Sequence, residues 1–185
     1  MGFTEAVRTC LTNYATFSGR ARRPEYWWFF LFVVLGGMVA SLIDGALFGF
    51  GTEEAPETQV FGPLWSLAMF LPLLAAGWRR MHDTGRAGWY LLIPMLISFA
   101  VLFLLGFEMA AFLAAGGPET IGPGLGACLA LVALLTVAQI VASLLILWWL
   151  TRPTQKGRNA FGPEPPVRPR GGASMSRRPT PRATT

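Results

Sequence analysis

The chain has 185 residues, of which 53% are hydrophobic and only 14% are charged, with a mean hydropathy of +0.47. Soluble domains carry roughly 25% charged residues, so this composition indicates a membrane protein. Its two cysteines and single histidine exclude a disulfide framework and argue against a zinc site. The net charge of +5 does not by itself indicate a nucleic-acid partner, because its meaning depends on where the charges lie. We expect no nucleic acid, metal or cofactor.

The first 18 residues are predicted to form a short amphipathic helix on the inner leaflet. Apolar side chains recur there at spacings of three and four, at Phe3, Val7, Leu11, Tyr14 and Phe17. The alternative is a helix packed against other cytoplasmic residues.

Residues 19–162 form the predicted membrane domain, with four apolar runs at about 26–50, 60–78, 89–107 and 125–150. A helix needs about 20 residues to cross the bilayer, and only helices satisfy their own backbone groups there. The second run is the weakest, because it is short and contains Pro63 and Pro72. The fold class predicted is therefore all-α, with four transmembrane helices in an antiparallel bundle.

The distribution of charge predicts the orientation of these spans. All 15 Lys and Arg residues lie in segments 1–25, 79–88 and 151–185. The intervening external loops contain glutamates but no basic residue. Aromatic rings mark the same boundary, namely Trp27, Trp28, Trp78, Trp89, Trp148 and Trp149. We therefore expect a multi-pass protein of the bacterial inner (plasma) membrane, with both termini in the cytoplasm.

Three polar side chains fall within the apolar runs. Asp44 and Glu108 are expected at the outer interface, where a carboxylate can meet water; the alternative is a proton relay. Gln139, near the middle of the fourth span, is expected to form a hydrogen bond between helices rather than a transport site.

Residues 163–185 are rich in Pro, Arg, Ser, Thr and Gly. Such a segment cannot bury enough apolar surface to order itself, so a disordered basic tail is predicted. Its arginines should attract anionic lipid.

Three polar stretches are expected to meet on the cytoplasmic face: 17–28, 79–90 and 152–163. We hypothesise that Glu25 and Asp83 pair there with Arg20, Arg23, Arg79 or Arg80, and that the resulting network closes the bundle. Arginines outnumber carboxylates, so some guanidinium groups could hold a lipid phosphate or another anionic ligand. The candidate cluster comprises Arg20, Arg23, Glu25, Arg79, Arg80, His82, Asp83 and Asn159.

The same stretches carry a family resemblance. The patterns F-S-G-R-x-x-R-P-E-Y-W-W, R-R-M-H-D-T-G-x-x-G-W and G-x-N-x-F-G-P-x-P occur in this order between about residues 11 and 166. Together they resemble the DUF805 family of small bacterial inner-membrane proteins. The chain departs from that pattern mainly in its arginine-bearing tail and its Gly/Pro-rich second external loop. Since the family has no assigned function, the resemblance implies a membrane protein but carries over no catalytic residue.

The leading hypothesis is a non-enzymatic integral membrane protein that assembles with the bilayer, with anionic phospholipid, with copies of itself or with another membrane protein. A small transporter or channel component is the alternative, with Gln139, Asp44 or Glu108 lining the route. A lipid-modifying enzyme that uses His82 and Asp83 is a third reading, for which one histidine offers little support.

Overall fold

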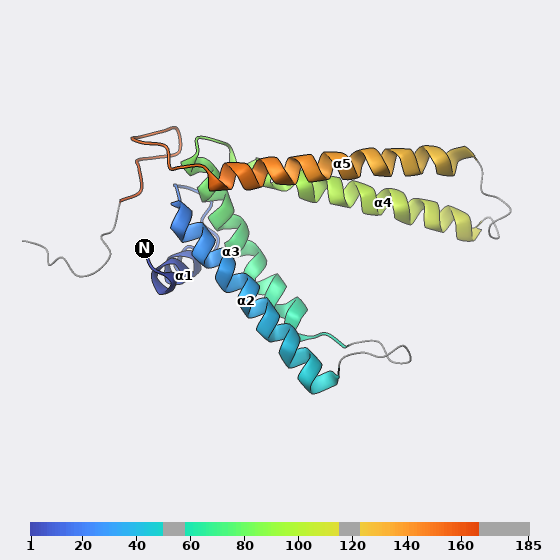
Figure 1. Cartoon of the computed structure of the whole chain (residues 1–185), viewed down its shortest axis with the longest axis horizontal. Helices are drawn as coiled ribbons and strands as arrows, with labels where there is room; N and C mark the ends of the chain where they lie inside the picture. Colours follow the sequence, from blue (N-terminus) through green and yellow to red (C-terminus); the bar gives the residue numbers. More distant parts are fainter. Residues whose placement is uncertain (50–57, 115–122, 167–185) are drawn as a thin grey trace, which may run out of the picture.

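A computed structural model describes residues 1–49, 58–114 and 123–166 (Figure 1). The part of the predicted tail at 167–185 lies outside these residues. The chain is helical, in the order α1 (Phe3–Thr12), α2 (Arg23–Phe48), α3 (Phe61–Asp83), the 3-10 helix η1 (Gly88–Leu92), α4 (Ile93–Ala114) and α5 (Pro123–Thr151).

Four of the helical segments are long and apolar enough to cross a membrane, as predicted: α2, α3, η1 with α4, and α5. The largest differences from the bounds of the apolar runs are at the ends of α3 and α4. The third helix continues to Asp83, so the charged residues predicted in a loop occupy its last turn. The fourth continues to Ala114, past the end of its apolar run at residue 107, so Glu108 lies within the helix.

The four helices form two antiparallel hairpins, α2 with α3 and α4 with α5, which diverge from a common end (Figure 1). At this common end α1 contacts α2 and α3, and η1 and α5 contact α3. We call it the polar end, because the charged last turn of α3 lies there. Most large apolar side chains away from it are exposed, as expected for surfaces that face lipid.

Close packing between α2 and α3 depends on a glycine. The Trp65 ring lies directly against Gly36, where an added Cβ would come within 2.0 Å of the ring. The Trp65 indole also donates a hydrogen bond of 2.9 Å to the Val33 carbonyl. A side chain at position 36 would therefore displace Trp65 from the helix interface.

Asp44 corrects one expectation, because its carboxylate is fully buried instead of meeting water. It accepts hydrogen bonds from the backbone N–H groups of Val60, Phe61 and Gly62, at 3.0, 2.9 and 2.8 Å. These amides begin α3 and have no partner within their own helix. Asp44 of α2 thus caps the start of α3 from across the hairpin.

Gln139 joins the second hairpin in the expected way. Its side-chain amide donates a 3.0 Å hydrogen bond to the Ser98 hydroxyl, which connects α5 to α4. The Ser98 hydroxyl in turn donates to the Pro94 carbonyl of its own helix. The Gln139 amide nitrogen thus has a partner in an otherwise apolar surface, whereas its Oε1 is buried without a hydrogen-bond partner among the described residues.

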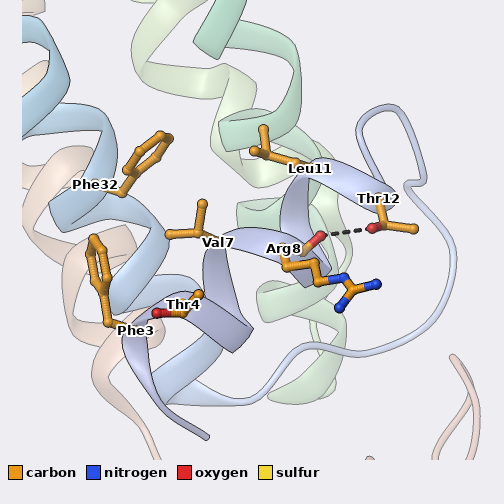
Figure 2. A pocket seen from close by; sticks show the side chains of 7 residues that line it. All are labelled: Phe3, Thr4, Val7, Arg8, Leu11, Thr12 and Phe32. Atoms are coloured by element: carbon orange, nitrogen blue, oxygen red, sulfur yellow. Dashed lines mark hydrogen bonds between the residues drawn. The ribbon is translucent and has the colours of Figure 1, made fainter.

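The first helix packs against α2 through its small residues, since Ala6 and Cys10 are its buried positions. Its larger apolar side chains instead line a groove of about 520 Å³ shared with Phe32 of α2 (Figure 2). Phe3, Val7 and Leu11 form one wall of this groove, and Phe3 meets Phe32 edge to face. Location on the membrane surface stays a prediction.

Candidate functional site

All eight residues of the predicted cytoplasmic cluster lie at the polar end. They come from the segment before α2, the start of α2, the last turn of α3 and the chain after α5. Arg80 and Asp83 are completely buried, and the side chains of Arg20, Glu25, Arg79 and His82 are less than one tenth exposed. Gln139 is not part of this group, because it bonds to Ser98 between α4 and α5. We call the eight residues the polar cluster.

Asp83 is the centre of the polar cluster. One carboxylate oxygen accepts from Arg20 Nε at 3.1 Å, and the other accepts from the Arg80 guanidinium at 2.5 Å. All three side chains are inaccessible to solvent. Removing charges from water is costly, so two buried arginines depend on this single carboxylate.

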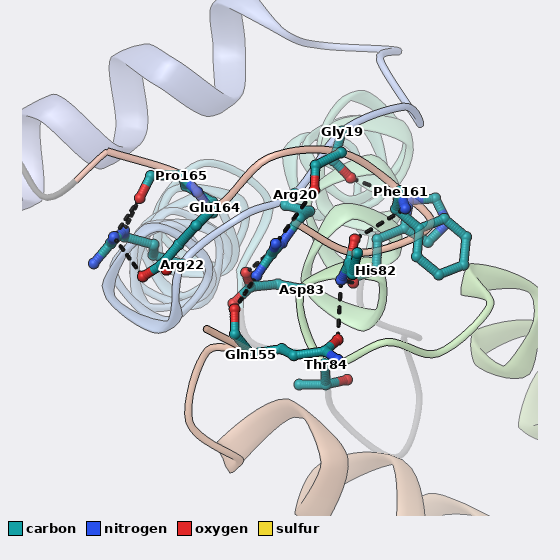
Figure 3. A network of polar contacts seen from close by, with 12 residues as sticks. Gly19, Arg20, Arg22, His82, Asp83, Thr84, Gln155, Phe161, Glu164 and Pro165 are labelled. Carbon is teal, nitrogen blue, oxygen red and sulfur yellow. Dashed lines mark hydrogen bonds and ion pairs between the residues drawn. The ribbon is translucent and has the colours of Figure 1, made fainter. Parts of the chain in front are cut away.

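Both guanidinium groups also donate hydrogen bonds to backbone carbonyls in the last turn of α5 and in the chain after it. Arg20 donates to the carbonyls of Gly157 at 2.6 Å and Gly162 at 3.3 Å, and to that of Gln155. Arg80 donates to the carbonyls of Leu150 at 3.1 Å and of Arg152. We call residues 152–166 the C-terminal strap, because these bonds fasten it across the polar end (Figure 3).

Glycines give the strap its path. Gly157 and Gly162 both have positive φ values, of 75° and 134°, which residues with a Cβ rarely adopt. Between them, Asn159 and Gly162 exchange backbone hydrogen bonds of 3.0 and 3.2 Å. The resulting turn directs two carbonyl oxygens toward Arg20.

A second buried pair links α2 to α3. Arg79 donates to Glu25 at 2.9 Å, and the Cys10 sulfur of α1 lies 4.0 Å from both side chains. Burial, and next the Glu25 charge, raise the pKa of the Cys10 thiol to about 12, so this thiol stays neutral. Arg79 Nε is buried without a hydrogen-bond partner among the described residues.

His82 contacts both of the other polar segments (Figure 3). Its Nδ1 lies 3.1 Å from the Gly19 carbonyl, which requires the proton on Nδ1. Its ring stacks on Phe161 at 3.9 Å with an interplanar angle of 5°, and Asn159 donates to its backbone carbonyl at 2.9 Å. The Asp83 carboxylate is bonded to arginines rather than to this imidazole.

The other arginines near α2 bind differently from what the charge pattern predicted. Arg23 donates to the Thr151 carbonyl at 2.9 Å instead of to a carboxylate. Arg22, which the prediction left out, donates to the Pro165 carbonyl and lies 3.5 Å from Glu164. The disordered tail was predicted to begin at residue 163, yet Glu164 and Pro165 make defined contacts.

Sequence reasoning missed the backbone acceptors of the strap and the thiol of Cys10. Every residue has a carbonyl, so an acceptor such as Gln155 leaves no mark in the sequence. The glycines at 157 and 162, spaced around Asn159 and Phe161, were the available signal for a tight turn. Nothing in the sequence places Cys10 beside Glu25.

The fold and the polar cluster define a multi-pass helical membrane protein whose three polar segments meet at one end. A family model described as "Protein of unknown function (DUF805)" matches residues 14–163, and the chain belongs to this family.

Two relatives from Escherichia coli strain K12 support this assignment. Inner membrane protein YhaH is 35% identical over 101 residues, which cover 55% of this chain and 81% of the relative. Inner membrane protein YhaI is 40% identical over 97 residues, which cover 52% of this chain and 76% of the relative. No solved structure matches the chain. Together with the four apolar helices, these relatives identify a multi-pass inner-membrane protein.

Proposed function

We propose that this is a non-enzymatic inner-membrane protein in which the polar cluster joins two helical hairpins and the C-terminal strap into one structure. The protein then acts by assembly, with anionic phospholipid at its cytoplasmic face and with copies of itself or another membrane protein. The observation that carries the proposal is the bonding of Arg20 and Arg80, whose guanidinium groups bind Asp83 and strap carbonyls.

The contacts of His82 and Asp83 favour a structural role over catalysis. In an acid–base pair the carboxylate orients the imidazole or stabilises its protonated form. Here Asp83 serves two arginines, and the His82 ring is held by Gly19 and Phe161.

In this proposal the polar end and both termini are cytoplasmic. Support comes from the charge distribution, because all 15 Lys and Arg residues belong to the three segments on one side of the spans. A reporter inserted at residues 84–87 should be active in the cytoplasm. Periplasmic activity of that reporter would show that the protein has the opposite orientation.

The structural role is tested by Arg20→Ala and Arg80→Ala, with Arg158→Ala as the matched control. Arg158 is an exposed arginine of the strap, so its loss removes the same charge without opening the polar cluster. We expect both cluster variants to lower the amount of protein in the membrane and its melting temperature in detergent, whereas the control changes neither. Equal behaviour of all three variants would refute a stabilising cluster.

A further inference from the structure

A pocket of about 320 Å³ lies beside the polar cluster and is separate from it. It is lined by Thr84, Arg86, Arg152, Pro153 and Gln155, which come from the turn after α3 and from the start of the strap. Neither arginine belongs to the polar cluster. The lining therefore contains two positive charges and no carboxylate.

Both arginines are held in place by indole rings. The Arg86 guanidinium carbon lies 4.8 Å from the centre of the Trp149 ring, and that of Arg152 lies 4.3 Å from the centre of the Trp148 ring. Cation–π contacts of this kind orient a guanidinium without using its N–H groups. The only hydrogen bond from either group within the described residues is from Arg86 to the Thr84 carbonyl, at 3.1 Å.

Within the described part of the chain, no carboxylate is paired with either of these arginines. Asp83 and Glu25, the buried carboxylates at this end, bind other arginines, and Glu164 lies beside Arg22. Among the described residues, neither Arg86 nor Arg152 forms an ion pair. Planar guanidinium groups with unbonded N–H edges are suited to bind a phosphate group.

The surrounding aromatic residues place this pocket at the level of lipid headgroups. Trp148 is 48% exposed in the last turn of α5. Trp89 is 51% exposed in η1, at the start of the span that pairs with α5. Indole rings at the ends of spans occupy the headgroup region. A phospholipid in this region therefore carries its phosphate at the level of the pocket.

We propose that Arg86 and Arg152 form a binding site for the phosphate of an anionic phospholipid, with Thr84 and Gln155 as neutral polar neighbours. The site rests on the proposed cytoplasmic orientation, since anionic lipid at that face attracts basic groups. It is also coupled to the polar cluster, because the Arg152 carbonyl accepts a hydrogen bond from Arg80.

The test is lipid binding by the full-length protein in detergent, measured by native mass spectrometry. Phosphatidylglycerol, phosphatidylcholine and inorganic phosphate are each titrated against the wild type. The site variant is Arg86→Gln with Arg152→Gln, and the matched control is Lys156→Gln with Arg158→Gln. The control removes two charges from exposed positions of the same strap, outside the pocket.

We expect phosphatidylglycerol to bind the wild type in preference to the other two probes. Each arginine near a lipid surface contributes roughly fivefold in affinity, so the site variant should bind it more than tenfold more weakly, and the control within twofold. An Arg152→Lys variant keeps the charge but loses the planar fork, and should bind more weakly than the wild type. Melting temperature in lipid-free detergent should be unchanged by both double variants.

Equal weakening in the site variant and the control would show diffuse attraction and overturn the site. Unchanged binding in the site variant, or equal binding of phosphatidylcholine, would overturn it too. Inorganic phosphate binding as tightly as the lipid would overturn the lipid assignment. None of these results affects the structural role of the polar cluster, which is judged by the stability of the Arg20 and Arg80 variants.

Discussion

Pro72 lies in the middle of α3 and has no backbone N–H to donate. The Ala68 carbonyl, one helical turn earlier, therefore lacks its usual partner. The Tyr14 hydroxyl, from the chain after α1, donates a hydrogen bond to this carbonyl. A single side chain thus compensates for the proline and ties the N-terminal segment to a membrane-spanning helix.

Tyr14→Phe should lower the free energy of unfolding by about 1 kcal/mol, since it leaves the Ala68 carbonyl without a partner. The same change in a Pro72→Ala background should have almost no effect, because residue 72 then supplies an N–H within the helix. Unfolding in detergent with increasing denaturant measures this double-mutant cycle. Equal effects of Tyr14→Phe in the two backgrounds would contradict the assignment.

At the level of the helices, the number and approximate position of the spans could be predicted from the sequence. The residues at which the helices end, and the contacts between helices, could not. Runs of apolar residues predicted four spans because a helix in lipid must be apolar over most of its length. The boundary of α3 was missed because Arg79 to Asp83 look like a loop, and only buried partners make a charged helical turn stable. Apart from the Arg80–Asp83 pair within the turn itself, the charged partners lie 54 or more residues away along the chain.

Asp44 illustrates the same limit at the other end of the hairpin. From the sequence it was an acidic residue close to a span end, where water was the expected partner. In the structure the partners are three amides of α3, which become neighbours only when the hairpin closes.

Asp44→Asn should destabilise the hairpin by about 1–3 kcal/mol, because the new amide group presents a donor to a backbone donor. Hydrogen–deuterium exchange can locate the change. Protection should fall at the amides of residues 60–62, while those of residues 77–80 at the far end of α3 serve as an internal control. Unchanged exchange at 60–62 would show that Asp44 does not hold the start of α3.

Over the whole molecule, the two hairpins diverge and make their shared contacts at the polar end (Figure 1). An antiparallel order of four helices was predictable from short connections. Divergence was not, because apolar surfaces of similar composition can face either lipid or another helix. The two hairpins therefore join in a small region, where the polar cluster adjoins buried apolar side chains such as Met81, Ile146 and Leu150, rather than along the length of their helices.

The structure brings the eight residues of the predicted cluster to one end of the molecule, and the positive-inside rule had grouped their segments on one side of a membrane. It left open which arginine pairs with which carboxylate. In the structure Arg20 and Arg80 both bind Asp83, and Arg79 pairs with Glu25. Arg23 instead donates a hydrogen bond to the Thr151 carbonyl. These choices depend on side-chain directions that only the folded chain defines.

The most direct test of the polar cluster is the free energy of unfolding of Asp83→Asn, compared with that of Glu164→Gln. Both changes remove one carboxylate that binds arginine, but Asp83 is completely buried and Glu164 is exposed. Loss of the Asp83 charge leaves two buried guanidinium groups uncompensated and should cost about 3–5 kcal/mol, whereas the Glu164 change should cost less than about 1 kcal/mol. Similar small losses for both variants would contradict the claim that the buried polar cluster holds the two hairpins and the strap together.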